Sequence, residues 1–378
     1  MKKRDSLLSL SLSLSLSLDQ SRFSRLTKQQ TSYKYKLQKG FTIVELLVVI
    51  VVIGILAAIT IVSYTGITQR ATVATLQSDL DNASKKLKMY YTLYGSYPTA
   101  LNASNCPTAP TADNNYCLPI SGSNTISYNG GASNFSLVET NGTTYYKTTD
   151  SSSPVATTSL YYGLSGYWNF DEGSGTATND ISMGGGGGVI NGTPTWVAGK
   201  YGSALNFLNG AANYTSVPFT FSTTNFTVSF WYKTSATLGN AEGWFGQSGS
   251  FAYERQGMNN VEVYAYLNAP NDYASGLRRL RFNVLTQTNT DNNWHHRVLV
   301  IYVQSGTAHA DEYQDGVYLQ TRGVDYTGDS ATPSGNLRIG DTVSGGNSFN
   351  GSMDDVRIYN NRSLTAAEIT ALYNAGAP

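Results

Sequence analysis

An apolar segment near the N-terminus constrains this chain more than any other feature of its 378 residues. Residues 41–62 (FTIVELLVVIVVIGILAAITIV) carry one charged side chain, that of Glu45. As a helix rising about 1.5 Å per residue, the segment would extend about 33 Å, enough to cross a hydrocarbon core of about 30 Å. We therefore expect residues 41–62 to form a membrane-spanning helix.

The charges before this segment predict its orientation. Residues 1–40 contain nine Lys or Arg against two Asp or Glu, and positively charged flanks stay in the cytoplasm. The N-terminus is therefore expected inside the cell. A cleaved secretory signal would have a shorter apolar core followed by a small-residue cleavage site. Ala57-Ala58 matches such a site poorly, so an uncleaved anchor is the plainer alternative.

Two residues distinguish the segment from an ordinary anchor. A charged side chain at the centre of a membrane helix costs about 2.5–3.5 kcal/mol on insertion scales, so Glu45 indicates a function. Gly40 immediately precedes the apolar segment. The sequence KGFTIVELL at 39–47 resembles the prepilin motif of type IV pilins and pseudopilins.

In that family a prepilin peptidase cuts after the glycine and methylates the new first residue. The resemblance implies cleavage after Gly40, methylation of Phe41, and a cytoplasmic leader over 1–40, which is long for the family. The family's glutamate, here Glu45, pairs with the free amine of a neighbouring subunit. Phe41 and Glu45 are thus the expected assembly residues. The expected partners are the peptidase, other pilin subunits and the cytoplasmic membrane.

Residues 63–95 are expected to continue as an amphipathic stalk helix. From Val73 to Tyr94, apolar residues recur at alternating spacings of three and four, which places them on one helix face. A coiled coil and a helix packed on a small sheet of its own chain both fit this pattern. Gly95 and Pro98 predict the end of the helix.

Residues 96–148 contain both cysteines of the chain, Cys106 and Cys117. Outside the cytoplasm, an isolated pair in a short segment is expected to form a disulfide bond. Short strand-like stretches follow, so we predict a small disulfide-bonded head. The polar segment 149–159 is predicted to be a linker to a further domain.

The remaining residues, 160–378, predict an all-β domain. Charged residues make up 13% of the chain, against about 25% in ordinary globular proteins, and strand-like runs alternate with Gly, Asn and Asp turns. The sequence TAAE at 365–368 predicts a capping box that starts a short terminal helix. Residues 41–378 hold sixteen basic and twenty-three acidic side chains. Direct nucleic-acid binding, which needs a basic surface, is not expected.

Several motifs in this region resemble a laminin-G-like jelly roll of the concanavalin A-like lectin/glucanase superfamily. They are GYWNFDEGSG at 166–175, YGSALNF at 201–207, FTVSFW at 226–231 and GSMDDVRIY at 351–359. The expected fold class of the whole chain is therefore α+β. A long N-terminal pilin helix with a small β head would precede an all-β concanavalin A-like jelly-roll sandwich.

We do not expect an enzyme. Hydrolases with this fold carry Glu-x-Asp-x-x-Glu on one strand, which places the carboxylates on one face. The chain lacks that triplet, and its adjacent acid pairs, Asp311-Glu312 and Asp354-Asp355, should point to opposite faces of a strand. The three histidines have no nucleophilic Ser or Cys motif beside them.

The sequence predicts two further sites in the jelly roll. Members of the superfamily often hold one calcium ion between a loop aspartate and an acid on the last strand, and Asp180 and Asp354 match those regions. The alternative to this calcium site is a solvated loop that binds no metal. We expect no other cofactor. Trp244, in a Gly-rich region, is the expected ligand contact, because sugars stack on exposed aromatic rings.

The sequence thus predicts a minor or tip pilin-like surface protein that displays a lectin-like domain for adhesion to a glycan or surface protein. The alternative is a structural pseudopilin of a secretion or DNA-uptake system, with the jelly roll as a protein-partner module. In both cases the precursor lies in the cytoplasmic membrane, and the assembled subunit lies at the cell surface.

Overall fold

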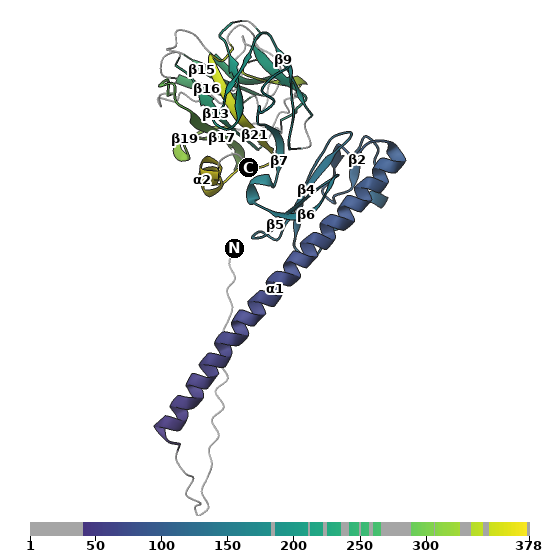
Figure 1. Ribbon diagram of the computed structural model, residues 1–378, viewed down its shortest axis with the longest axis vertical. Helices are drawn as coiled ribbons and strands as arrows, with labels where there is room; N and C mark the ends of the chain where they lie inside the picture. Colours follow the sequence, from purple (N-terminus) through teal and green to yellow (C-terminus); the bar gives the residue numbers. More distant parts are fainter. Residues whose placement is uncertain are drawn as a thin grey trace, which may run out of the picture. The chain divides into compact units, whose positions relative to one another are not determined.

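A computed structural model describes residues 41–182, 186–210, 212–221, 225–235, 242–248, 251–256, 260–265, 289–305, 307–325, 334–342 and 348–375 (Figure 1). Contacts divide the chain into two units, Met1–Ser63 and Tyr64–Pro378, which are described separately. The order of elements confirms the predicted class, because a long helix precedes many antiparallel strands.

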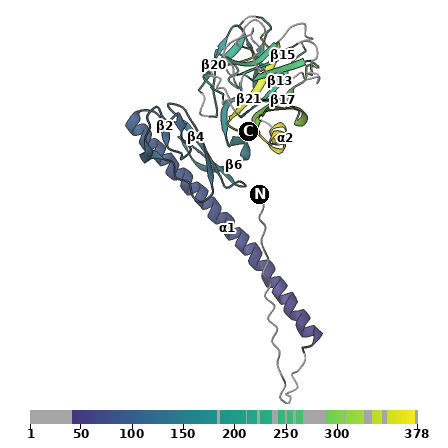
Figure 2. The same ribbon diagram turned by 180° about the vertical axis from the view of Figure 1, so that it is seen from behind.

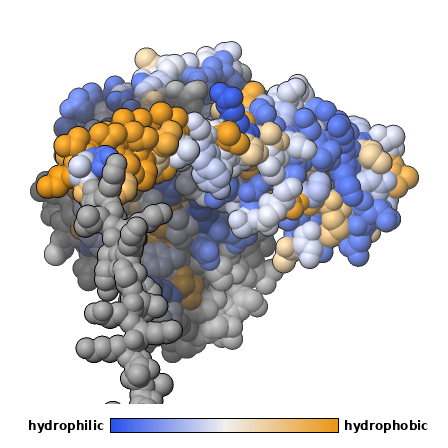
Figure 3. All heavy atoms as spheres, turned by 90° about the horizontal axis from the view of Figure 1, so that it is seen from below, coloured by the Kyte–Doolittle hydropathy of each residue, from blue (hydrophilic) through white to orange (hydrophobic). Residues whose placement is uncertain are grey.

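Helix α1 (Ile43–Tyr94) has 52 residues. Its N-terminal part is apolar and unburied, and by length and composition it could cross a membrane. Large apolar side chains from Phe41 to Ile67 are exposed. They form a continuous hydrophobic surface, drawn orange in Figure 3. This length and composition fit a single-pass anchor.

The C-terminal part of α1 packs on a small antiparallel sheet. The strands follow the order β3 (Thr125–Gly130), β4 (Phe135–Thr140), β5 (Tyr145–Thr149) and β6 (Ser152–Thr157). One stripe of α1, which includes Leu80, Ala83 and Leu87, packs with Phe135 and Leu137 in a buried cluster. Figures 1 and 2 show the sheet beside this part of the helix. The heptad spacing therefore reflects packing on the chain's own sheet.

The head differs from the prediction at its end. Strand β6 lies inside the segment 149–159 that was predicted to be a linker, and a 3-10 turn, η2 (Ser159–Tyr161), follows it. Pro154 and several Ser and Thr residues made this segment look like a linker. An edge strand accepts proline because one side of its backbone needs no partner.

The expected disulfide bond joins Cys106 to Cys117. Between the two cysteines the chain forms β2 (Pro107–Ala109) and a 3-10 turn, η1 (Asn114–Tyr116), and β1 (Ala100–Leu101) pairs with β2. The bond closes a loop of the head that contains little regular structure. The disulfide bond predicted from the isolated cysteine pair is therefore confirmed.

The distal domain consists of two antiparallel sheets. The eight-stranded sheet has the order β10-β11-β21-β13-β17-β18-β19, with β7 also paired to β21. Its strands are β7 (Leu164–Trp168), β10 (Thr195–Ala198), β11 (Ser203–Phe207), β13 (Phe226–Lys233), β17 (His295–Gln304), β18 (Thr307–Gln314), β19 (Val317–Asp325) and β21 (Gly351–Asn360).

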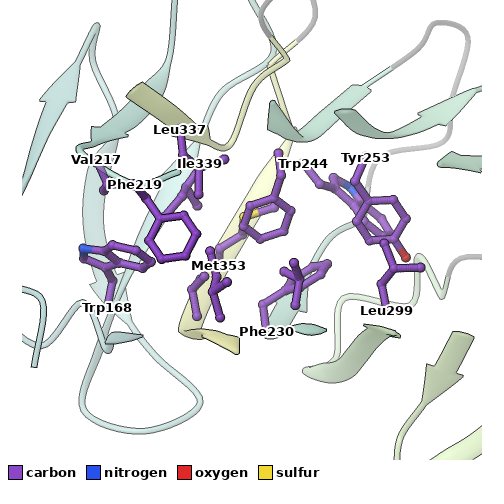
Figure 4. Close-up of a cluster of buried hydrophobic side chains, with 14 of the residues drawn as sticks. Trp168, Val217, Phe219, Phe230, Trp244, Tyr253, Leu299, Leu337, Ile339 and Met353 are labelled. Atoms are coloured by element: carbon purple, nitrogen blue, oxygen red, sulfur yellow. The ribbon is translucent and has the colours of Figure 1, made fainter. Parts of the chain in front are cut away.

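The seven-stranded sheet has the order β16-β15-β14-β20-β12-β9-β8. Its strands are β8 (Ala177–Thr178), β9 (Gly188–Asn191), β12 (Tyr214–Val217), β14 (Glu242–Ser248), β15 (Phe251–Gln256), β16 (Asn260–Ala265) and β20 (Ser334–Ile339). Alternate side chains of both sheets meet in one apolar cluster, and Figure 4 shows Trp168, Phe230, Trp244 and Met353 within it. This is the core of a β-sandwich.

The outer face of the larger sheet carries a second apolar cluster. Val298, Val300 and Tyr359 of the sheet pack there with Ile369 and Leu372 of helix α2 (Ala366–Ala375). The predicted capping box starts this helix, since the Thr365 N–H donates to Glu368 Oε2 over 3.0 Å and the Glu368 N–H donates to Thr365 Oγ1 over 3.3 Å. The terminal helix therefore covers this part of the outer face.

Candidate functional site

The predicted assembly residues lie at the start of α1. Gly40 falls outside the described residues, and the side chain of Phe41 is 77% exposed. Glu45 Oε2 accepts hydrogen bonds from the Thr42 backbone N–H, 2.9 Å away, and from the Thr42 hydroxyl, 2.8 Å away. The Glu45 N–H donates back to Thr42 Oγ1 over 3.2 Å. In a single chain, Glu45 thus caps its own helix.

Thr42 is a residue that the sequence reasoning missed at this site. Its signal was visible, because Thr42-Ile-Val-Glu45 has the spacing of a capping box. The hydroxyl and backbone N–H of Thr42 give the carboxylate two donors before any neighbouring subunit supplies a partner. The arrangement orients Glu45 toward the N-terminal end of the helix.

The structure contradicts the prediction that Trp244 contacts a ligand. Trp244 lies on β14 and its side chain is 0% exposed. Its ring centroid lies 5.3 Å from that of Phe230 and 4.9 Å from that of Tyr253, in edge-on contacts that Figure 4 shows. The glycines beside Trp244 lie within strand β14, and not in an exposed turn as the sequence suggested. Trp244 is a core residue.

Each of the two predicted calcium ligands accepts backbone N–H groups. Asp180 Oδ1 accepts the N–H groups of Tyr167 and Ser182, each over 2.8 Å. Asp354 Oδ2 instead accepts the N–H of Tyr201 over 3.0 Å. Within the described ranges, no three His, Cys, Asp or Glu side chains are grouped so as to hold a metal ion. A calcium ion shared by Asp180 and Asp354 stays a prediction.

Asp354 belongs to a row of buried polar side chains on the outer face of the larger sheet. Trp231 of β13 pairs with Asp354 of β21 on one side and with His296 of β17 on the other. Each of the three side chains contains one buried polar atom without a hydrogen-bond partner: Trp231 Nε1, His296 Nδ1 and Asp354 Oδ1. Burial raises the pKa of Asp354 to about 7 and lowers the pKa of His296 to about 3.

This row includes a hydrogen bond between a hydroxyl and an imidazole. Ser229 Oγ lies 2.8 Å from His296 Nε2, the geometry of a nucleophile and its base. Both side chains are buried, however, and His296 Nδ1 has no acid to orient the ring. Tyr373 of α2 stacks on Trp231 with a centroid distance of 5.6 Å and closes the row from outside. The pair is therefore part of the packing beneath α2.

A charged pair that the sequence did not reveal lies between the two sheets. Arg297 Nη2 is 3.0 Å from Glu312 Oε1, and both side chains are 0% exposed. The Tyr253 hydroxyl bonds to both of them. Asp311, the neighbour of Glu312, is half-buried, which agrees with the predicted alternation of adjacent acids. The pair is a fully satisfied polar network inside the core.

A surface hollow of about 830 Å³ lies where β3 meets the segments around Gly163, Thr220 and Asn360. Its lining offers uncharged hydrogen-bonding groups and three aromatic residues, Tyr128, Tyr162 and Phe219. The polar residues of the lining include Ser127, Asn129, Ser165, Thr220, Asn360 and Asn361. The charge of Arg362, which also lines it, is offset by an ion pair with Glu368. The volume is typical of small-molecule sites.

Hydrogen bonds hold the head and the distal domain together at this hollow. The side-chain amide of Asn129 donates to Leu164 O over 3.2 Å and to Ser182 Oγ over 2.9 Å. Ser127 Oγ accepts the Gly163 N–H over 3.0 Å. Both domains therefore contribute side chains to one polar concavity. It could not be predicted from the sequence, because the contacts join residues 35 or more positions apart.

Two family profiles match separate parts of the chain. The prokaryotic N-terminal methylation motif matches residues 35–61, and the concanavalin A-like lectin/glucanases superfamily matches residues 209–370. The chain is 33% identical over 75 residues to the type IV major pilin protein PilE1 of Neisseria gonorrhoeae, covering 20% of this chain and 46% of that protein. It is 35% identical over 77 residues to a fimbrial protein of Neisseria meningitidis, covering 20% and 44%. The chain thus spans less than half the length of these relatives.

Among solved structures, domain 4 of AbnA, an extracellular arabinanase from Geobacillus stearothermophilus solved with arabinotriose, resembles the chain with a TM-score of 0.41 and 21% identity. The match covers 56% of this chain and 98% of that one. The binding domain of botulinum neurotoxin serotype D matches with a TM-score of 0.40 and 13% identity over 56% and 51% of the two chains. From its sequence matches and its two-sheet domain, the chain carries the N-terminal methylation motif of type IV pilins, joined to a C-terminal domain of the concanavalin A-like lectin/glucanases superfamily.

Proposed function

We propose that this protein is a minor or tip subunit of a type IV pilus-like filament that displays its jelly roll to bind a glycan at the cell surface. The observation that carries the proposal is the joining of a pilin N-terminus to a separate two-sheet domain in one chain. A domain of this size on every subunit would crowd a filament shaft, which favours a minor position. In this proposal the leader faces the cytoplasm before processing.

The hollow beside β3 supports a neutral sugar as the ligand. Its lining combines amide and hydroxyl groups with aromatic rings, and the ion pair of Arg362 with Glu368 leaves no uncompensated charge among the lining side chains. A pyranose presents hydroxyl groups around its rim and C–H groups on its faces, so it uses both kinds of surface. Phe219 is buried, and the half-buried Tyr128 already donates its hydroxyl to Pro98 O, so we choose the half-buried Tyr162 as the residue that offers its ring to the sugar.

The proposal includes no catalytic step. Ser229 and His296 are buried beneath α2, and the carboxylates of Asp180 and Asp354 each accept backbone N–H groups. A site for hydrolysis needs an acid and a nucleophile or base exposed to the same substrate atom. Binding without turnover is therefore the activity that we propose.

A glycan array tests this function on the processed full chain in detergent micelles. We expect binding to one class of neutral oligosaccharide, weakened about fivefold in Tyr162→Ala because a ring contact of this kind contributes about 1 kcal/mol. Tyr318→Ala is the matched control, since Tyr318 is 49% exposed on β19. Absence of any glycan binding would favour the structural pseudopilin role, with a protein as the partner of the jelly roll.

A further inference from the structure

The hollow between the head and the distal domain opens onto an unpaired edge of strand β3. Strand β3 ends the order of the head sheet, so one edge pairs with β4 and the other pairs with no strand that the structure describes. Ile126 and Tyr128 pack toward the cluster on α1, whereas Ser127 and Asn129 bond to the distal domain. All four residues line the hollow. Because they belong to both faces of the strand, the hollow lies at its edge.

This edge offers backbone groups to a ligand. An unpaired strand edge presents the N–H and C=O groups of alternate residues. Within the described part of the chain, the backbone groups of Thr125–Gly130 form hydrogen bonds only with β4. The strand is half-buried or exposed along its whole length. The outward N–H and C=O groups of β3 are therefore available to a molecule in the hollow.

The distal domain supplies unused side-chain groups on the other side of the hollow. Thr220 and Asn361 both line it, and both are exposed. Among the described residues, neither the Thr220 hydroxyl nor the Asn361 side-chain amide has a hydrogen-bond partner. The side-chain amide of Asn360 donates to Thr220 O over 2.9 Å, which joins the two segments. Hydrogen-bonding groups thus lie on both sides of the hollow.

The lining also contains a small apolar surface. Ile126 of the head and Pro218 and Phe219 of the distal domain contribute to it. Pro218 is exposed, and Ile126 is half-buried. A ligand that uses the whole lining therefore combines hydrogen-bonding groups that point in two directions with a small apolar group.

We propose that the sugar bound in this hollow carries an acetamido group. The inference rests on the proposed function, because it names the class of neutral sugar. The C=O and N–H of a trans amide point in opposite directions, so the C=O can accept a β3 N–H while the N–H donates to Thr220 or Asn361. The methyl group then contacts the apolar surface of Ile126, Pro218 and Phe219. A hydroxyl on the same ring carbon is too short to reach both sides.

Titration calorimetry of the processed full chain in detergent micelles compares di-N-acetylchitobiose with cellobiose. The two disaccharides are neutral and identically linked, and each ring differs only in having an acetamido group in place of one hydroxyl. We expect di-N-acetylchitobiose to bind at least about tenfold more tightly, since hydrogen bonds in a partly enclosed site change affinity by about this factor. Equal or weaker binding of di-N-acetylchitobiose would overturn this inference and leave sugar binding in place. Absence of binding to any neutral glycan would overturn both proposals.

A double variant tests whether the hollow is the source of the preference. Asn361→Ala removes the free amide, and Thr220→Val replaces the hydroxyl by a methyl group of similar size. We expect the preference for di-N-acetylchitobiose over cellobiose to fall at least about fivefold, with little change in the affinity for cellobiose. Asn374→Ala is the matched control, because Asn374 is exposed on α2 and does not line the hollow. An unchanged preference in the double variant would overturn the proposal.

Hydrogen exchange tests the edge of β3 directly. The backbone amides of β3 that point away from β4 have no partner, so they should exchange rapidly in the free protein. Saturating di-N-acetylchitobiose should slow at least one of them about tenfold, and saturating cellobiose should not. Strand β6, at the other end of the same sheet, is the control. Unchanged exchange in β3 at saturation would exclude its edge as the acetamido site.

Discussion

Thr42 and Glu45 close the first turn of α1 with hydrogen bonds in both directions. Each bond satisfies a donor that the start of a helix leaves unpaired, and the carboxylate also interacts favourably with the positive end of the helix dipole. Glu45 therefore has two separable properties, a hydrogen-bond acceptor that caps the helix and a negative charge. Pairing with the amine of a neighbouring subunit would use the charge.

Glu45→Gln separates these two properties. Its amide oxygen can still accept the Thr42 N–H, so the helix should form and the precursor should be processed. Without the charge, a neighbouring Phe41 amine would be buried unpaired, and we expect the amount of subunit in sheared filaments to fall at least about tenfold. Immunoblotting of sheared and membrane fractions measures this, with Thr42→Ser, which keeps the hydroxyl, as control. Normal incorporation of the glutamine variant would refute charge pairing.

At the scale of elements, α1 changes its environment along its length. Its N-terminal part exposes apolar side chains on all sides, while its C-terminal part buries one stripe against β3, β4 and β5. A helix that is apolar all round suits lipid or the interior of a helix bundle, and an amphipathic one suits the surface of a sheet. The N-terminal part of the helix thus fits a membrane anchor, and the C-terminal part supports the sheet of the head.

Leu87→Ala tests the contribution of the stripe to the head. Leu87 is 0% exposed in the head cluster, and replacing a buried leucine by alanine costs about 2–5 kcal/mol. We expect backbone amides of β4 to exchange at least about thirtyfold faster, measured by hydrogen exchange and mass spectrometry of the processed chain. Leu93→Ala is the control on the same helix, since Leu93 is 61% exposed. Equal exchange in both variants would show that the stripe does not stabilise the sheet.

At the scale of the whole molecule, the chain combines three kinds of structure that suit different surroundings. An apolar helix segment, a small disulfide-bonded head and a two-sheet domain follow one another along the sequence. The disulfide bond fits an oxidising compartment for the head. A filament would place the apolar segment among other helices and leave the jelly roll at the surface.

Processing gives a direct test at this scale. We expect the mature protein from sheared filaments to begin at Phe41 with one added methyl group, because the motif around Gly40 matches the prokaryotic methylation motif. Intact mass measurement and N-terminal sequencing determine both features. Gly40→Asp should leave the leader attached and retain the protein in the membrane fraction. A mature chain that begins at any other residue would contradict this prediction.

Local patterns in the sequence determined the anchor, the caps and the disulfide bond. These three features depend only on residues close together in the chain or on the redox state of the compartment. They can therefore be predicted without knowing the fold. The period of apolar residues from Val73 to Tyr94 also fixed which face of α1 would be buried. Whether that face would meet a sheet or another helix remained open until the sheet was known.

Tertiary structure alone decided which polar and aromatic side chains are exposed. Trp244 is buried because its side chain packs in the core between the two sheets, which the glycines around it do not reveal. Asp180 and Asp354 accept different backbone groups because each lies opposite a different segment. These outcomes depend on contacts between residues far apart in the chain, and the spacing of residue types within one segment does not encode them.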